Sequence, residues 1–251
     1  MKAILVSILI SILLSVTGFQ IQADEHNSDW PKPVIDIKTG KVLFDRLELA
    51  RSNEQENRAV WDMLAWYGGD YHRLVFKSEG ENTQNDGEPT DLESAELLYG
   101  YLISPFWSFQ TGIGTRGELS SGTQMEHYAV IGFMGLAPYW FEMDNSLLIN
   151  EKGDLQFISE MEYDWQLTQT SYLQPRLELT ANLSDSEKYD RQSGFSHLRM
   201  GLRYRHEITR EFAPYVGVYW DKALGNSADA LQAQGAATSE TGFVLGARVW
   251  F

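Results

Sequence analysis

The chain has 251 residues, a formal net charge of −15 and no cysteine. The lack of thiols excludes disulfides, thiolate metal sites and cysteine nucleophiles. The acidic charge argues against nucleic-acid binding, which needs an excess of lysine and arginine, and favours cations as partners.

The first residues have the pattern of a secretory signal peptide. Lys2 precedes an apolar run over residues 3–16, and the small Ala23 precedes the acidic Asp24. We therefore predict that residues 1–23 form a signal peptide cleaved after Ala23. The alternative is an uncleaved anchor, but the run is shorter than the ~20 residues a spanning helix needs. Residues 24–40 are polar and aperiodic, which predicts a mobile leader.

From residue 41 onward, segments of alternating apolar and polar residues predict β-strands. We expect residues 41–251 to form an all-β fold, a closed antiparallel transmembrane β-barrel of about twelve strands. A ten-stranded barrel with residues 41–67 outside it is the alternative. The expected strands cover residues 41–51, 58–67, 72–79, 94–103, 106–117, 125–135, 138–150, 154–167, 172–182, 195–208, 212–221 and 240–251.

Closure of the barrel is predicted from the last strand and from the connections. Apolar residues occupy every second position back from Phe251 to Phe243. A terminal strand with an open edge invites aggregation, so we expect it to pair with the first strand. Tight turns also alternate with longer polar loops, which is typical of outer-membrane barrels.

Aromatic residues near the short turns predict an interfacial girdle. Three turns share a Pro-aromatic sequence, beginning at Ser104, Ala137 and Ala213. Aromatic residues at one height suit a membrane–water interface. The expected girdle comprises Phe106, Trp107, Tyr139, Trp140 and Tyr215.

The polar faces of the strands predict a charged lumen, because the apolar faces must meet lipid. A barrel of this size is too narrow for a wide pore, so ion pairs would partly fill it. We interpret the charges mainly as a salt-bridged plug, with a charged path or ion site as a compatible second role. The expected network comprises Glu142, Asp144, Glu160, Glu162, Asp164, Arg176, Glu178, Arg199, Arg203, Arg205 and Arg248.

Three residues are candidate metal ligands. Met125 and His127 would share a strand face, and a thioether beside an imidazole suits Cu(I). His197 falls on the expected lumen face, where hydrogen bonding is the alternative role. A barrel lipid hydrolase is a further alternative, with His127 paired to Ser121 or Ser146, although nothing in the sequence selects either serine. We expect no enzyme activity.

Several long segments resemble the copper resistance protein B family of outer-membrane proteins. They are W-Y-G-G-D-Y-H-R-L-V-F-K-S-E-G-E (residues 66–81), E-L-L-Y-G-Y-L-I-S-P-F-W (96–107), G-L-A-P-Y-W-F-E (135–142), L-Q-P-R-L-E (173–178) and R-E-F-A-P-Y-V-G-V (210–218).

The resemblance implies a barrel in the cell outer membrane that binds copper and supports copper tolerance by export or sequestration. It also implies outer-membrane lipid and periplasmic copper carriers or an oxidase as partners, and we expect a monomer. Family members often carry Met- and His-rich repeats before the barrel, whereas residues 24–57 here contain His26 and no methionine. We therefore expect any metal site to lie in the barrel.

Overall fold

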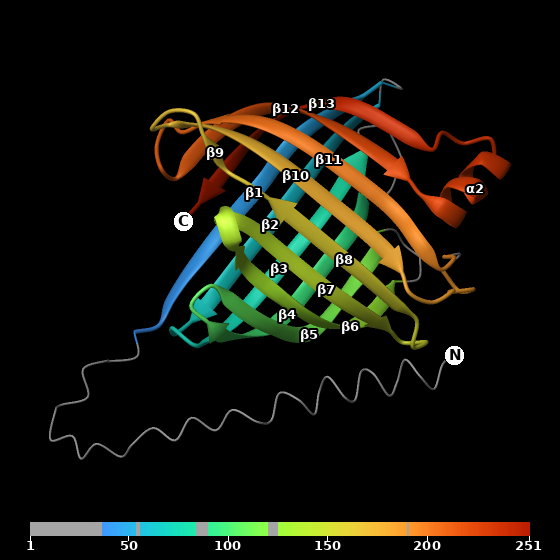
Figure 1. The fold of residues 1–251 in the computed structure, drawn as a ribbon, viewed down its shortest axis with the longest axis horizontal. Coiled ribbons are helices and arrows are strands. Elements are labelled where there is room, and N and C mark those ends of the chain that lie inside the picture. The colour runs from blue at the N-terminus through green and yellow to red at the C-terminus, as the bar shows by residue number, and fades with distance from the viewer. Residues whose placement is uncertain (1–36, 54–55, 84–89, 120–124, 190) are drawn as a thin grey trace, which may run out of the picture. The chain divides into compact units, whose positions relative to one another are not determined.

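The computed structural model describes residues 37–53, 56–83, 90–119, 125–189 and 191–251. These residues form one closed antiparallel sheet (Figure 1). The predicted signal peptide (residues 1–23) and most of the predicted leader (24–40) lie outside the described residues. The first strand begins at Thr39.

The described residues contain thirteen strands, of which β9 has two residues and continues the line of β8 along β10. Twelve strands therefore span the barrel, as predicted. The ten-stranded alternative is wrong, because β1 and β2 pair within the sheet. The strands are β1 (Thr39–Ser52), β2 (Asn57–Gly68), β3 (His72–Thr83), β4 (Thr90–Ser104), β5 (Trp107–Glu118), β6 (Glu126–Ala137), β7 (Phe141–Asn150), β8 (Leu155–Glu162), β9 (Trp165–Gln166), β10 (Ser171–Asn182), β11 (Gly194–His206), β12 (Phe212–Ala223) and β13 (Ser239–Trp250).

The sequence pattern predicts one strand over residues 154–167, whereas the structure divides it into β8 and β9. Pro175 on the neighbouring strand β10 accounts for this break. Proline has no N–H to donate to the ladder. Its carbonyl still accepts from the N–H of Tyr163 at 3.2 Å. The ladder resumes beyond it, where Trp165 pairs with Leu173.

The terminal strand closes the barrel, as predicted. β13 pairs with β1 from Leu43↔Trp250 to Ser52↔Gly242. At the end of this seam, Val42 and Phe251 exchange backbone hydrogen bonds of 3.1 and 2.9 Å. No edge is left at the C-terminal strand, which removes the aggregation hazard.

The longest connections lie at one end of the barrel, although the β7–β8 turn at that end is short (residues 151–154). Residues 69–71, 105–106 and 138–140 make short turns at the end that carries the C-terminus, the periplasmic end in barrels of this type. The opposite, extracellular end carries longer connections such as 183–193 and 224–238. The last of these contains α2 (Gly225–Ala233), a helix that the sequence pattern missed. Among the described residues, no helix is long and apolar enough to cross a membrane.

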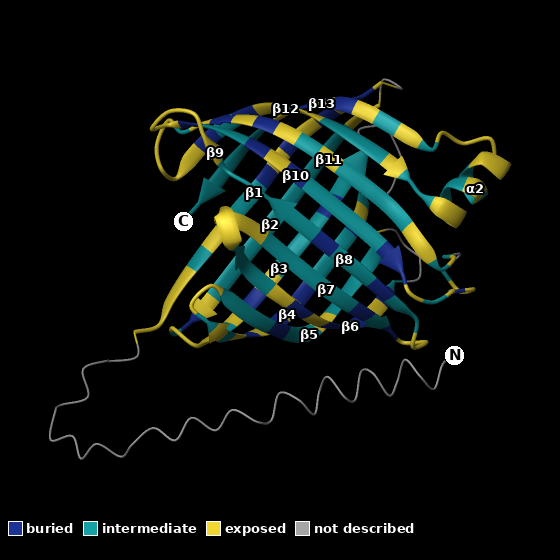
Figure 2. Cartoon of the chain, in the orientation of Figure 1, coloured by how far each residue is buried: buried dark blue, intermediate teal, exposed yellow. Residues whose placement is uncertain are grey.

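The outer surface carries an exposed apolar band, including Leu49, Ile113 and Phe243. Figure 2 shows buried positions interspersed with less buried ones along the strands. Tyr139 is 83% exposed, as a girdle residue should be, whereas Tyr215 is only 4% exposed. The prediction for Tyr215 is wrong, because its ring turns into the lumen, where its hydroxyl meets Glu48.

Part of the lumen is apolar, which the sequence did not lead us to expect. Buried side chains on β3, β4, β6 and β7 pack together, and residues of β2 and β8 pack against them. This apolar wall consists of Val75, Leu98, Tyr128, Val130 and Leu148, with Leu64, Trp66 and Ile158. Charged residues therefore share the lumen with a hydrophobic core.

Candidate functional site

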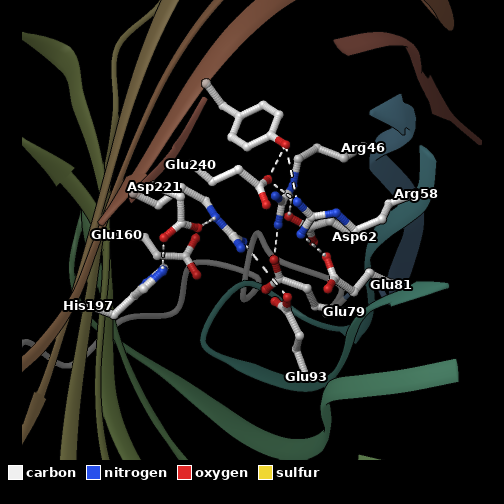
Figure 3. A network of polar contacts seen from close by, with 12 residues as sticks. Arg46, Arg58, Asp62, Glu79, Glu81, Glu93, Glu160, His197, Asp221 and Glu240 are labelled. Atoms are coloured by element: carbon white, nitrogen blue, oxygen red, sulfur yellow. Dashed lines mark hydrogen bonds and ion pairs between the residues drawn. The ribbon is translucent and has the colours of Figure 1, made fainter. Parts of the chain in front are cut away.

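Two buried arginines are central to the polar part of the lumen. Arg176 of β10 donates to Glu160 and Glu162 of β8, both at 2.8 Å, and approaches Asp62 of β2 at 3.4 Å. Arg46 of β1 also binds Asp62, at 3.1 Å, and pairs with Glu79 of β3. Figure 3 shows Arg46 and Asp62 within this network. The two arginines thus join opposite parts of the barrel wall through a shared carboxylate.

Other predicted lumen arginines pair across strands. Arg203 binds Glu48 at 2.6 Å, and Arg205 binds Asp164 at 2.5 Å. Arg199 binds Asp221 at 2.9 Å. Across the closing seam, Arg248 of β13 lies 2.9 Å from Asp45 of β1. Asp144 pairs with Lys77, while Glu142 and Glu178 border the central cavity.

The first four strands also contribute charged residues to the lumen, and these are absent from the expected network. Alternation could have identified Asp62, Lys77 and Glu79, which lie two residues from other lumen positions. In β1 and β4 the alternation is interrupted by β-bulges, which bring the adjacent Asp45 and Arg46, and also Glu93, to the lumen. The charged lumen residues missed there are Asp45, Arg46, Glu48, Arg58, Asp62, Lys77, Glu79, Glu81, Glu93 and Glu96.

The central cavity has a volume of about 400 Å³ and a strongly acidic lining. Ten acidic residues border it, against the three basic residues Lys77, Arg116 and Arg248. Arg46, Arg176 and Arg199 offset part of this charge through their ion pairs. Acidic linings attract cations and repel anions. The acidic residues are Asp45, Asp62, Glu79, Glu93, Glu96, Glu142, Asp144, Glu160, Glu162 and Glu178.

Two tyrosines reach glutamates by crossing a glycine on the strand between. Tyr128 of β6 lies opposite Gly114 of β5 and donates to Glu96 of β4 at 3.1 Å. A second row has the same order across the closing seam. There Tyr215 of β12 crosses Gly246 and donates to Glu48 of β1 at 3.1 Å. We call these the Tyr–Gly–Glu rows.

The structure separates the three candidate metal ligands. His197 lies in the lumen and bonds to Asp221 through Nε2 (Figure 3). His127 is on the exposed outer face of β6, away from His197, and Met125 precedes that strand. Within the described ranges, no group of three or more His, Asp or Glu residues has an arrangement suited to a metal ion.

The serine–histidine pairs considered for a hydrolase are not brought together. Ser146 bonds to Asp144 on the lumen side, whereas His127 faces outward, and Ser121 lies outside the described residues. A different pair does form near the periplasmic end, where Ser171 Oγ and His206 Nδ1 are 2.9 Å apart. The third group at this pair is the hydroxyl of Tyr204, 3.2 Å from Ser171 Oγ.

The family described as "Copper resistance protein B precursor (CopB)" matches residues 38–251. Copper resistance protein B of Escherichia coli is 37% identical over 210 residues, covering 84% of this chain and 69% of that protein. A copper resistance protein B homolog of Pseudomonas syringae pv. tomato is 33% identical over 209 residues, covering 83% and 69%. The solved NanC porin aligns with a TM-score of 0.51 at 12% identity, covering 84% of this chain and 99% of that one, which supports the fold alone.

A closed antiparallel barrel with an apolar outer band and a charged lumen defines an outer-membrane β-barrel protein. The outer membrane is therefore where this chain resides. It belongs to the copper resistance protein B family, and this membership gives it a role in copper resistance.

Proposed function

We propose that the barrel supports copper tolerance by taking copper ions into its acidic lumen, for export or sequestration, without catalysis. The observation that carries this proposal is the cavity bordered by ten acidic residues and three basic ones. Excess negative charge inside a low-dielectric wall concentrates cations. Copper is the cargo here, received from periplasmic copper carriers or an oxidase by a monomeric barrel.

Weak, exchangeable ligation suits this role, because a conducted ion must be able to leave each site. His197 is the proposed nitrogen ligand inside the lumen. Its Nε2 would release its hydrogen bond to Asp221 and bind the ion instead. Met134 is an additional proposed donor, since the residue borders the cavity. Its sulfur accepts a hydrogen bond from Gln110 Nε2 at 3.5 Å, which the ion would replace. His127 on the outer face of β6, together with Met125 just before that strand, remains a proposed contact for copper at the extracellular rim.

Copper flux into dye-loaded vesicles containing the purified barrel tests the lumen route. We expect the Glu96→Gln, Glu142→Gln double variant to slow flux, because two cavity carboxylates lose their charge. His197→Ala should weaken copper retention, while a Met125→Ala, His127→Ala variant should leave lumen flux intact. Glu211→Gln is the matched control, since this exposed residue lies in a periplasmic turn.

Copper tolerance of a deletion strain complemented with each variant provides the cellular readout. Flux equal to that of empty vesicles, together with unchanged copper tolerance after gene deletion, would contradict the proposal. Bound copper without flux would favour sequestration over export.

A further inference from the structure

The connection between β10 and β11 has its own internal structure at the extracellular end. Ser186 and Arg191 exchange backbone hydrogen bonds of 2.7 and 3.0 Å. The Asp185 carboxylate accepts from the N–H of Ser193 at 2.7 Å, which lowers the pKa of Asp185. We refer to the described residues 183–189 and 191–193 as the β10–β11 hairpin.

Arg191 extends from this hairpin to the buried Glu126 on the lumen face of β6. Glu126 also accepts from Arg116 Nε at 2.6 Å and from Asn150 Nδ2 at 3.1 Å. Arg116 borders the acidic cavity as well as the space around Glu126. The Arg191 side chain is thus fixed above the extracellular side of the cavity.

A second tie holds the hairpin to the turn between β7 and β8. Lys188 Nζ lies 2.5 Å from Glu151 Oε1, and the Tyr189 hydroxyl bonds to the same carboxylate. At the hairpin base, Ser184 Oγ accepts from the N–H of Leu155 at 2.7 Å. The space enclosed around Glu126 and Arg191 is about 10 Å³, at the lower limit for one water molecule. This sector of the opening is therefore sealed.

We propose that the β10–β11 hairpin is a lid over the acidic cavity, latched by the Arg191–Glu126 pair. Its side-chain ties can break while the β-ladder stays intact. Gly194, at the start of β11, has a φ of 125°, a conformation that glycine adopts without strain and that suits a hinge. The identity of the ion that passes the lid rests on the proposed function. The opening of the lid is independent of it.

Conductance of the full barrel in planar bilayers, recorded in potassium chloride, tests the lid without copper. Loss of a hydrogen bond between charged groups should raise the open-to-closed ratio of Arg191→Gln about tenfold. Lys152→Gln removes a charge from the neighbouring turn and serves as the control. Heat-modifiable gel mobility verifies that each variant is a folded barrel.

A cross-link tests the same lid in the opposite direction. The chain contains no cysteine, so a Glu151→Cys, Lys188→Cys double variant carries the only two thiols. A short, reducible bis-thiol reagent should hold the lid shut and abolish the opening events, and reductant should restore them. The single variant Lys188→Cys, treated with the same reagent, should keep its openings.

Two results would overturn the lid. One is equal conductance of Arg191→Gln and Lys152→Gln, including no conductance in either. The other is opening that persists in the cross-linked barrel. If the conductance and cross-linking results support the lid but the barrel shows no copper flux, the proposed function is contradicted and the lid proposal is unaffected.

Discussion

Arg176 is almost fully buried, yet it carries a charge in the lumen. Its side chain is 5% exposed and lies within ion-pair distance of Asp62, Glu160 and Glu162. Removing a charge from water costs several kcal/mol unless partners compensate. The three carboxylates in turn need Arg176, because without it their own negative charges would lose a cationic partner.

We expect Arg176→Met to destabilise the barrel by about 3 kcal/mol, since breaking a buried ion pair leaves uncompensated charge. Urea unfolding of the barrel in lipid vesicles measures this change. Arg210→Met, at an exposed periplasmic turn, should change stability by less than about 0.5 kcal/mol. Equal stability of the two variants would show that solvent, rather than Arg176, compensates the carboxylates.

Glu151, outside the membrane span, provides a pH test. The hydrogen bonds from Lys188 and then from Tyr189 lower its pKa to about 2. A lowered pKa means that the contact contributes fully above the ordinary value near 4.5 and is lost as the pH falls toward 2. We expect Lys188→Gln to raise the pKa of Glu151 toward 4.5, as measured by NMR titration of a labelled carboxyl carbon. An unchanged pKa would mean that the Lys188 contact does not form in solution.

At the scale of elements, the Tyr–Gly–Glu rows join three neighbouring strands. A side chain on Gly114 would meet the Tyr128 ring at 2.5 Å, and one on Gly246 would meet the Tyr215 ring at 2.7 Å. Each glycine thus provides the space in which a ring can lie flat across its strand, an arrangement known from other glycine–aromatic pairs in sheets. One row lies beside the apolar wall and the other spans the closing seam.

We expect Gly114→Val to displace the Tyr128 ring, break its bond to Glu96 and destabilise the barrel by about 1–3 kcal/mol, as overpacking does. Ile113→Val, on the outer face of the same strand, is the control. Urea midpoints and near-ultraviolet circular dichroism of the tyrosines measure both effects. An unshifted tyrosine signal in Gly114→Val would contradict the proposed role of the glycine.

At the scale of the whole molecule, charge and hydrophobic packing divide the lumen between them. The apolar wall fills one part of the interior and gives it a core, as in a soluble protein. The remaining cavity carries excess carboxylates, and its extracellular side is bounded by Arg116, Glu126 and Arg191. Under the proposed function, an ion crossing the barrel would therefore pass through a narrow acidic region.

This arrangement predicts selectivity for potassium over chloride. Reversal potentials across a potassium chloride gradient measure the permeability ratio. In the Glu96→Gln, Glu142→Gln double variant, the potassium-to-chloride permeability ratio should fall about threefold for each lost charge. This is the effect expected of a unit charge several ångströms from the ion in a water-filled lumen. Glu211→Gln should retain the parental ratio. A barrel that prefers chloride would contradict this prediction and show that the arginines, rather than the carboxylates, determine the electrostatic potential of the lumen.

Alternation along the strands determined much of the fold without any tertiary information. Because successive side chains of a strand point to opposite faces, position alone predicts that Leu245 faces lipid and Arg248 faces the lumen. The same rule applied to Arg176 and Glu160. The closure at Phe251 followed from the cost of an open edge.

The tertiary structure decided which side chains meet, because ring closure brings together residues far apart in the sequence. Arg203 meets Glu48, and Arg248 meets Asp45, only because β10–β13 close onto β1. Glu126 and His127 are both polar, so periodicity could not say which faces the lumen. The packing of Tyr128 and Val130 inside decided in favour of Glu126. The position of the β10–β11 hairpin likewise depends on contacts with Glu126 and Glu151, which local sequence cannot specify.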